Sequence, residues 1–313
     1  MKIVTIVILN FNGQKDTVEC LKSIDRLKAT NYKLKVVVVD NGSTNKFKIQ
    51  FSGFAWGENS KFKDDELKII RNDYNLGFAG GNNVGIKHSL EQGADYVLVL
   101  NNDTIVDENL LEQLLKAAKE DPEIGIIAPK IYFAKGYEFH KDKYTDLEKG
   151  KVIWYAGGVM DWKNVLGRHR GVDAVDIGQF NKSGLTEFAS GCCMFVKREV
   201  FLKVGFFDEK YFLYYEDSDF CLRAKKMGYK IWFTSSALLW HKNAGSAGGS
   251  GSTLQDYYIT RNRMLFGIKY APFRLKFALL RESIFLLFQG RDWQKRGILD
   301  FYLNRFGRGS YTI

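Results

Sequence analysis

Residues 96–104 read Tyr96-Val97-Leu98-Val99-Leu100-Asn101-Asn102-Asp103-Thr104, a run of apolar residues that stops at three polar ones. Such a run indicates a strand that is buried on both faces of a parallel sheet. In open α/β sheets, polar groups at the carboxyl end of a central strand lie where ligands bind, although the same residues also suit a plain polar turn. The residues that follow predict a helix with Asp107 as its N-cap and a buried stripe of Leu110, Leu111, Leu114 and Leu115.

Further strands and helices alternate on both sides of this stretch. Apolar runs at 3–9, 36–39, 67–70 and 124–127 predict strands, and the segments between them carry helical patterns. This alternation predicts an α/β fold with a mostly parallel sheet and helices on both faces. In the second half, 188–196 and 229–233 indicate strands and 217–227 a helix, whereas 131–185 gives no clear pattern. The Gly/Ser-rich stretch 245–252 suits either a lid over the ligand or a flexible linker.

Composition narrows the class of protein. The chain has 313 residues, of which 45% are hydrophobic and only three are proline, so either one large domain or one domain with an appendage is expected. The four cysteines, Cys20, Cys192, Cys193 and Cys221, form no Cys-x-x-Cys motif and are expected to be free thiols in a reducing cytosol. The apolar start is interpreted as a first strand, because it contains no small-residue cleavage site.

Positive charge gathers at the end of the chain. Residues 261–313 contain eleven Lys or Arg against three acidic residues, so this segment carries 11 − 3 = +8 of the formal net charge of +10. Phe273 to Phe288 is strongly apolar but is interrupted by charged residues, and it does not reach the ~20 apolar residues that a membrane span needs. Two interpretations remain open: a helix that lies at a membrane surface, or a terminal helix pair packed on the domain.

Polar side chains follow three of the predicted strands. Asp40 and Asp103 each end a buried strand, and Asn10 and Asn12 follow the first strand. Carboxylates and amides at this sheet edge suit the hydroxyl and base groups of a nucleotide. The glycine-rich segment 77–85 allows close approach of the backbone to a ligand, but it matches neither the dinucleotide fingerprint nor the P-loop.

The chain resembles family 2 glycosyltransferases of the GT-A fold, in particular their rhamnosyltransferase-like branch. The resemblance covers about residues 3–265 and rests on an ordered set of motifs: Ile8-Leu9-Asn10-Phe11-Asn12, Val39-Asp40-Asn41-Gly42-Ser43, Asn75-Leu76-Gly77-Phe78-Ala79, Leu100-Asn101-Asn102-Asp103-Thr104, Glu216-Asp217-Ser218-Asp219-Phe220 and Trp240-His241. It implies a glycosyltransferase domain at 1–255, with a nucleotide-binding half at about 1–130 and an acceptor-binding half at about 131–255. Residues 256–313 would form a basic, aromatic helical extension.

The resemblance also implies roles for single residues. Asp40 would hold the nucleoside, and the donor site as a whole would comprise Leu9, Asn10, Asn12, Asp40, Asn75, Gly77, Asn101, Asn102 and Asp103. Asp103 would bind Mg²⁺ or Mn²⁺ at the donor diphosphate, with His241 as a second metal ligand. The family pattern here is Asp-x-Asp, and Asn101 replaces its first carboxylate, so weaker metal binding is expected.

The acidic motif at residues 216–217 matches the family position of the general base. Asp217 is the expected base and Glu216 the alternative, although this acidic pair would also stabilise a helix N-terminus. A metal-neutralised diphosphate leaves without a general acid, and attack from the opposite side inverts the anomeric centre. Ser190, Gly191 and Cys192 resemble the floor of the acceptor pocket. Arg261 and Arg263 are candidates for a clamp on the diphosphate oxygens, with surface charge as the alternative.

Together these inferences predict a metal-dependent, inverting glycosyltransferase of polysaccharide assembly. The expected donor is a dTDP- or UDP-sugar, with dTDP-rhamnose preferred, and the expected acceptor is a glycan or a lipid-diphosphate-linked glycan. We expect a cytoplasmic protein with peripheral contact to the inner face of the membrane and no nucleic-acid partner; the oligomeric state is open, with a dimer among the options. The alternatives are a nucleotidyltransferase and a non-catalytic relative that binds nucleotide-sugar or glycan.

Overall fold

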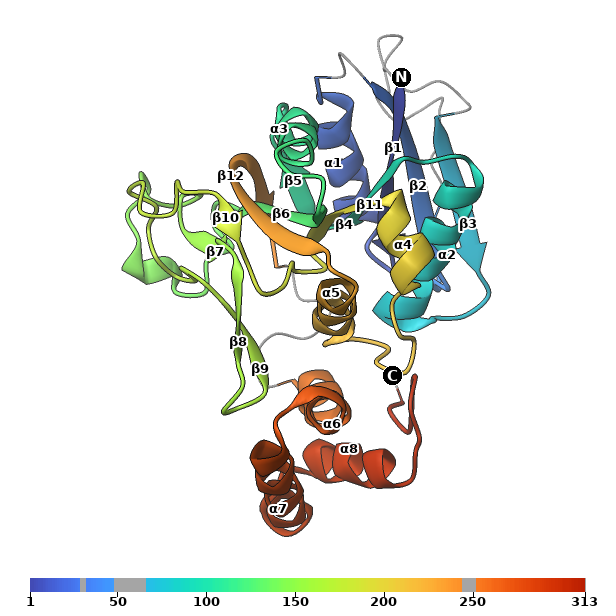
Figure 1. Ribbon diagram of the computed structural model, residues 1–313, viewed down its shortest axis with the longest axis vertical. Helices are drawn as coiled ribbons and strands as arrows, with labels where there is room; N and C mark the ends of the chain where they lie inside the picture. Colours follow the sequence, from blue (N-terminus) through green and yellow to red (C-terminus); the bar gives the residue numbers. More distant parts are fainter. Residues whose placement is uncertain (29–31, 48–65, 244–251, 313) are drawn as a thin grey trace.

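The computed structural model describes residues 1–28, 32–47, 66–243 and 252–312. A twisted central sheet passes through the molecule, with helices on both of its faces and a separate group of C-terminal helices at one end (Figure 1). The Gly/Ser-rich stretch 245–252 lies outside the described part of the chain, except for Ser252.

The first half of the chain forms the parallel part of the sheet. It contains β1 (Lys2–Asn10), α1 (Gln14–Asp25), β2 (Tyr32–Asn41), β3 (Leu67–Asn72), α2 (Gly77–Glu91) and β4 (Tyr96–Asn101). The strands pair in the order β3-β2-β1-β4, and every one of these pairs is parallel. All four carboxyl ends therefore meet at one edge of the sheet.

The second half of the chain extends this sheet with mixed strand directions. Its elements are β5 (Thr104–Val106), α3 (Leu110–Ala117), β6 (Ile124–Phe133), a short 3₁₀ turn at Lys141–Lys143, β7 (Ile153–Tyr155), β8 (Gly158–Asp161), β9 (Leu166–His169), β10 (Gly184–Leu185), β11 (Cys193–Lys197), α4 (Arg198–Val204), α5 (Glu216–Lys226) and β12 (Lys230–His241). β11 lies antiparallel between β4 and β6, and β12 runs parallel to β6. The expected α/β fold with a mostly parallel sheet is confirmed.

The core lies between the sheet and the helices on each face. Helices α1 and α3 contact one face through β1, β5, β6 and β12, and α2, α4 and α5 contact the other face. The apolar residues 97–100 are at most 1% exposed, as expected for a strand covered on both sides. The four cysteines are buried free thiols.

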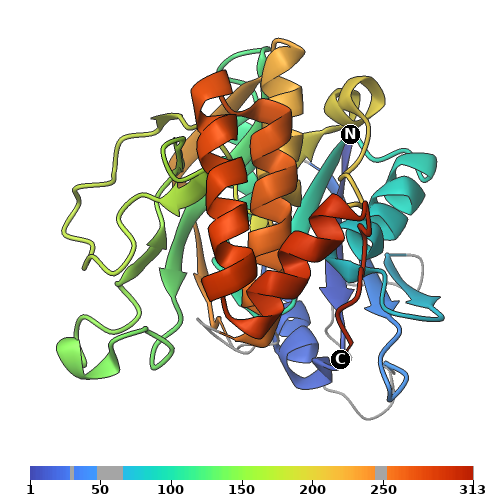
Figure 2. The same cartoon turned by 90° about the horizontal axis from the view of Figure 1, so that it is seen from below.

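Three helices follow the sheet: α6 (Thr253–Tyr270), α7 (Phe273–Gln289) and α8 (Asp292–Tyr302). They lie across the underside of the molecule, beyond α5, with α7 furthest from the sheet (Figures 1 and 2). No helix among the described residues combines the length and the apolar character that a bilayer crossing requires.

Several boundaries differ from those expected. Helix α3 begins at Leu110 with Asn109 as its N-cap, because Asp107 instead accepts a hydrogen bond from the Asn109 amide in the preceding turn. The strand expected at 188–196 begins only at Cys193. β12 is longer than expected and continues to His241 across a register shift between Thr234 and Leu238, which brings His241 to the site described below.

Candidate active site

Strand register gathers the predicted donor residues at one level of the sheet. Asn10 pairs with Asp40 across β1 and β2, and Leu9 pairs with Asn101 across β1 and β4. On the far side of β2, Asp40 is level with Arg71 of β3. The carboxyl edge therefore presents amide, carboxylate and guanidinium groups side by side, where open α/β sheets bind nucleotides.

Asp40 is held in a dense network and is only 1% exposed. One carboxylate oxygen accepts from Asn10 Nδ2 at 3.2 Å, and the other accepts from the Phe47 amide at 3.0 Å and from Arg71. Burial alone would raise the pKa of Asp40, but hydrogen bonds from Ser43 and Phe47 and the charge of Arg71 together lower it. Asp40 thus stays ionised and fixes Arg71, whose side chain is 32% exposed and faces solvent beside it.

The loops around this network use the other predicted donor residues. Exposed Asn12 accepts from the Thr44 amide, and Asn75 accepts from the Gly77 amide at 2.8 Å. Asn102 donates to Thr17 at 3.0 Å and so ties the end of β4 to α1. Gly77 has a φ of +76°, and a Cβ there would lie 2.5 Å from Phe212, so only glycine fits between α2 and the loop before α5.

The predicted metal ligands lie together. His241 pairs with Thr104 across β12 and β5, and its Nε2 lies 3.1 Å from Oδ1 of Asp103. Trp154 contacts the rings of both His241 and His169, with centroids 4.6 and 4.4 Å away. Burial lowers the pKa of His169 to about 4, so this second histidine is neutral and serves as packing for the Trp154 ring.

These residues fit a divalent cation. The Nδ1 atom of His241 is buried without a hydrogen-bond partner, while Nε2 lies within hydrogen-bond distance of the Asp103 carboxylate, so an imidazole nitrogen and a carboxylate oxygen are adjacent. Within the described ranges no group of three or more His, Cys, Asp or Glu side chains converges as a complete ligand set. A cation held by one carboxylate and one imidazole therefore needs further oxygen ligands, which a diphosphate supplies.

Asp217 and Asp103 lie at the same end of the sheet. Asp217 Oδ2 accepts from the Gly191 amide at 3.1 Å, and the next carbonyl, that of Cys192, accepts from the Asn101 amide at 2.9 Å. Two consecutive residues of the acceptor-floor segment thus connect the acidic motif of α5 to the metal motif of β4. The structure thus brings these two distant motifs to the same edge of the sheet.

The two carboxylates at the start of α5 differ in environment. Glu216 is 4% exposed and its Oε2 has no partner, and burial together with the charge of Asp217 raises its pKa well above the ordinary value. Asp217 is half-buried and accepts from Gly191 and from both the amide and the hydroxyl of Ser218. Burial also raises its pKa. Asp217 is therefore the carboxylate that an acceptor can reach.

The loop before α5 is held in an unusual conformation. Phe212, Tyr214 and Tyr215 all have positive φ values, between 63° and 74°. Such backbone is strained for residues with side chains and persists only where neighbouring groups fix it. Asn262 of α6 supplies that support, because its amide donates to the carbonyls of Tyr211, Leu213 and Tyr214 at 2.8, 2.8 and 3.0 Å.

The two arginines of α6 do not form the expected diphosphate clamp. Arg261 is fully buried and donates to the carbonyls of Lys210 and Tyr211, so it supports the same loop as Asn262. Arg263 forms a two-pronged ion pair with Glu282 of α7. Both side chains are used to attach the C-terminal helices, which the residue types alone did not indicate.

The predicted acceptor floor is close-packed. Ser190 and Cys192 are about 5% and 4% exposed, and burial raises the pKa of the Cys192 thiol well above its ordinary value. A Cβ at Gly191 would lie 2.9 Å from the ring of Phe78, so the backbone at this position approaches α2 closely. The segment positions Asp217 through the Gly191 amide, and its cysteines are inert packing groups.

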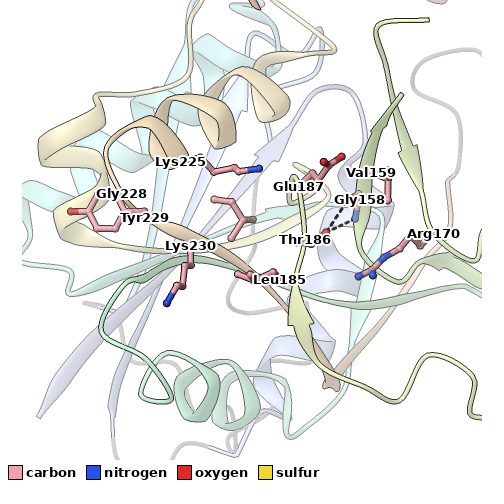
Figure 3. Close-up of a pocket in the computed structure, with 11 residues that line it drawn as sticks. Gly158, Val159, Arg170, Leu185, Thr186, Glu187, Lys225, Gly228, Tyr229 and Lys230 are labelled. Carbon is pink, nitrogen blue, oxygen red and sulfur yellow. Dashed lines mark hydrogen bonds between the residues drawn. The ribbon is translucent and has the colours of Figure 1, made fainter. Parts of the chain in front are cut away.

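A cavity of about 360 Å³ lies at the other end of α5. It is lined by β8, β10, the end of α5 and the start of β12, and Lys225 and Arg170 extend toward it from opposite sides (Figure 3). Asp217 is at the start of α5, which has eleven residues and is ~16 Å long at 1.5 Å per residue. This cavity is therefore separate from the candidate active site.

Four residues that contribute to the site were not identified from the sequence. Arg71 directly follows the short strand that was expected at 67–70. Its position after that strand is its only signal in the sequence. Trp154 and His169 lie in the 131–185 region, where no pattern was visible. Asn262 stands between two arginines that drew attention for their charge, and its role depends on a contact 51 positions away in the chain.

Comparison with known proteins gives the class of this protein. The model of glycosyl transferase family 2 matches residues 5–205, and that of glycosyl transferase family group 2 matches residues 152–303. The first match covers well over half of the chain, which therefore belongs to glycosyl transferase family 2. The chain is a glycosyltransferase.

Curated relatives are similar to this chain at low identity. The low-salt glycan biosynthesis hexosyltransferase Agl10 of Haloferax volcanii is 25% identical over 83% of this chain and 74% of its own length. The dTDP-rhamnosyl transferase RfbF of Shigella flexneri is 26% identical over 90% of this chain and 84% of its own length. The N-acetylglucosaminyl-diphospho-decaprenol L-rhamnosyltransferase of Mycobacterium tuberculosis is 26% identical over 70% of each chain. The chain spans much less of some others, such as 18% of the O-antigen biosynthesis protein RfbC of Myxococcus xanthus.

Solved structures confirm the GT-A fold. GalNAc-T7, solved with UDP, GalNAc and Mn²⁺, has a TM-score of 0.60 at 15% identity. The match covers 91% of this chain and 57% of the GalNAc-T7 chain. The mannosyltransferase PcManGT of Pyrobaculum calidifontis, in complex with GDP-Man and Mn²⁺, has a TM-score of 0.55 at 16% identity, with 99% of this chain and 76% of that one covered.

Proposed function

We propose that this chain is a metal-dependent, inverting glycosyltransferase that moves a sugar from a dTDP- or UDP-sugar to a glycan hydroxyl. The observation that carries the proposal is the convergence of Asp103, His241 and Asp217 at the carboxyl edge of one sheet. Two of these residues suit a cation at a diphosphate, and the third suits proton removal. A binding protein without activity would not need a half-buried carboxylate with a raised pKa beside the donor edge.

Two kinds of evidence support the proposed donor: the side chains at the nucleoside position and the names of similar proteins. Asp40 and Arg71 offer a carboxylate and a guanidinium at the place where a nucleoside would lie, and the loops at Asn12 and Asn75 frame it. Rhamnose on dTDP is the preferred sugar, because relatives that match most of this chain are named as rhamnosyl transferases. A divalent metal is proposed on the fit of Asp103 and His241, and neighbours of the same fold contain Mn²⁺.

The mechanism needs one base and one neutralised leaving group. Asp217 takes the proton from the acceptor hydroxyl, and its raised pKa makes it a stronger base than an exposed aspartate. Burial and the charge of Asp217 raise the pKa of Glu216 well above its ordinary value, which disfavours a second buried negative charge in the site. When bound, the cation would neutralise charge on the leaving diphosphate. Attack from the side opposite that diphosphate inverts the anomeric carbon.

The acceptor is proposed to be a glycan carried on a lipid diphosphate. The Mycobacterium tuberculosis relative is named for an acceptor of this class. The Gly191 segment and Asp217 would form the floor on which the acceptor hydroxyl lies. With such an acceptor, the protein would work in the cytoplasm at the inner face of the membrane.

Donor binding is tested by thermal unfolding with a panel of nucleotide-sugars, with and without Mn²⁺. A donor that binds only the folded state raises the midpoint, by ~2.7 kcal/mol of stability at a concentration 100 times its dissociation constant. We expect protection by one dTDP- or UDP-sugar that depends on Mn²⁺, followed by transfer of that sugar to a lipid-linked glycan. Protection that is the same without metal, or the absence of protection by any nucleotide-sugar, would contradict the proposal.

A further inference from the structure

Helix α7 is attached to the rest of the molecule along one side only. Of its seventeen residues, Leu279 and Ser283 are the buried ones. Leu279 packs against Gly267 of α6, where an added Cβ would lie 2.2 Å from its Cδ1, and Glu282 pairs with Arg263. The inner side of α7 is thereby fixed to α6, and its outer side has no partner among the described residues.

The outer side carries a continuous stripe of large apolar residues. Phe273, Phe277, Ile284 and Phe288 are 73%, 58%, 55% and 74% exposed. Their spacing of four, seven and four places them on one face of a helix that turns every 3.6 residues. Phe285, which is 62% exposed, extends the stripe on one flank. An apolar patch of this kind on a protein surface indicates an interaction site.

Positive charge borders the stripe. Arg274 and Arg281 are exposed on the flank toward Phe285, and Lys276 lies on the other flank. The acidic residue of α7, Glu282, has a half-exposed side chain that is neutralised by Arg263. The outer face therefore combines five large apolar side chains with three cations and no unpaired acidic group, within a C-terminal segment of charge +8.

We propose that the outer face of α7 binds the surface of an anionic lipid bilayer, with the apolar stripe inserted at the level of the headgroups. Interfacial helices bury an apolar face to a depth of ~5–10 Å, and nearby Lys and Arg side chains strengthen binding to an anionic membrane. A second copy of this chain is disfavoured as the partner, because an antiparallel pairing of these faces would bring cations against cations. Anionic headgroups complement the same pattern.

The arrangement also relates the membrane to the active site. The helices α6–α8 form the end of the molecule beyond the carboxyl edge of the sheet, with α7 outermost (Figure 1). Val165, at the tip of the β8–β9 hairpin, lies 3.3 Å from the Cβ position of Gly267 in α6 and accepts a hydrogen bond from Tyr215, next to the acidic motif. The membrane-bound end would thus be the end from which a lipid-linked acceptor reaches Asp217. This last link rests on the proposed function, whereas lipid binding does not.

Binding to vesicles tests the proposal with the full chain. We expect sedimentation with vesicles that contain about a third anionic lipid, and at least tenfold weaker partitioning for the double variant Phe277→Gln and Phe288→Gln. The matched control is Ile177→Gln with Leu202→Gln, which are 86% and 65% exposed on other parts of the surface and should bind as the parent does. Equal binding by the parent and the α7 variant, or no binding by the parent, would overturn the proposal.

A site-specific label separates insertion from simple attraction of a basic protein. All four native cysteines are buried, so a cysteine introduced at Phe285 can be labelled selectively with an environment-sensitive dye. We expect its emission to increase on anionic vesicles, and no increase for the same label at Leu202. If instead the α7 variant changes a dimer into a monomer and vesicles have no effect, the face is a contact between copies. Donor protection by nucleotide-sugar should be the same in every variant, so failure of the proposed function would be seen separately.

Discussion

The imidazole Nε2 of His241 lies 3.1 Å from the carboxylate Oδ1 of Asp103, although 138 positions of sequence separate the two residues. The end of β12 pairs with β6 on one side and with β5 on the other, and the pairing with β5 brings His241 to the end of β4. The proposed metal dependence rests on this pair.

We predict that His241→Ala weakens metal binding about tenfold or more, because the cation would lose one of two protein ligands. The measurement is the Mn²⁺ concentration that gives half of the donor-dependent thermal protection. His140→Ala is the matched control, since His140 is 65% exposed and pairs with Asp173 instead. An unchanged Mn²⁺ requirement in His241→Ala would remove this residue from the metal site.

Asn101→Asp should strengthen metal binding. Asn101 lies level with Leu9 at the end of β4, two residues before Asp103, where a carboxylate would add an anionic oxygen ligand for a hard cation. We expect half-maximal protection at several-fold lower Mn²⁺ than in the parent chain. A higher Mn²⁺ requirement would show that the amide is needed for another contact.

Asp217→Asn should retain donor protection and lose transfer by about 10²-fold or more, because a general base contributes factors of this size. In the parent chain the rate should fall as pH decreases through the raised pKa of Asp217, since the ionised form is the active one. The acid limb of kcat/KM is therefore expected above the ordinary aspartate value of 3.8. Asp146→Asn, on the exposed surface, is the control. Normal turnover by Asp217→Asn would assign the base to another group.

Glu216→Gln should stabilise the protein more at pH 8 than at pH 5. The folded-state pKa of Glu216 is raised, so the folded state holds a proton that the unfolded state releases above pH 4.5. Stability from this residue is therefore full below that pH and is lost as pH rises, whereas glutamine does not ionise. We expect a difference of about 1–3 kcal/mol in unfolding free energy at pH 8, measured by denaturant titration without metal or donor. A difference that does not change with pH would contradict the buried, neutral state of Glu216.

Asn262→Ala should lower kcat while the donor affinity stays near that of the parent. The substitution removes the donor to three carbonyls of the strained loop that precedes Asp217. Buried acceptors without partners cost about 1–3 kcal/mol, so a lower unfolding midpoint is also expected. Kinetics with saturating donor distinguish the two effects, because a purely structural role would leave kcat of the folded enzyme unchanged. Arg263→Ala, which removes an ion pair with half-exposed Glu282, is the control for α6.

The sheet and its polar edge could be predicted because their signals are local. The apolar run at 97–100 stops at Asn101, and the runs at 36–39 and 3–9 stop at Asp40 and Asn10. Because the carboxyl ends of parallel strands lie at the same edge of a sheet, these three runs were sufficient to predict that Asn10, Asp40 and Asn101 lie close together. The strand register pairs Asn10 with Asp40 and Leu9 with Asn101. The strands β7, β8 and β9 at 153–169 could not be predicted in this way, because they are only three or four residues long.

The amino-acid sequence by itself determined which side chains end the buried strands, because that depends only on the order of apolar and polar residues along the chain. It also determined the charge of the C-terminal segment. Only the tertiary structure decided that Arg261 lies in the interior, that Glu216 is shielded while Asp217 is accessible, and that α7 exposes its phenylalanines. Each of these three facts depends on which face of a helix is covered by residues far away in the sequence. The local sequence pattern does not specify those residues.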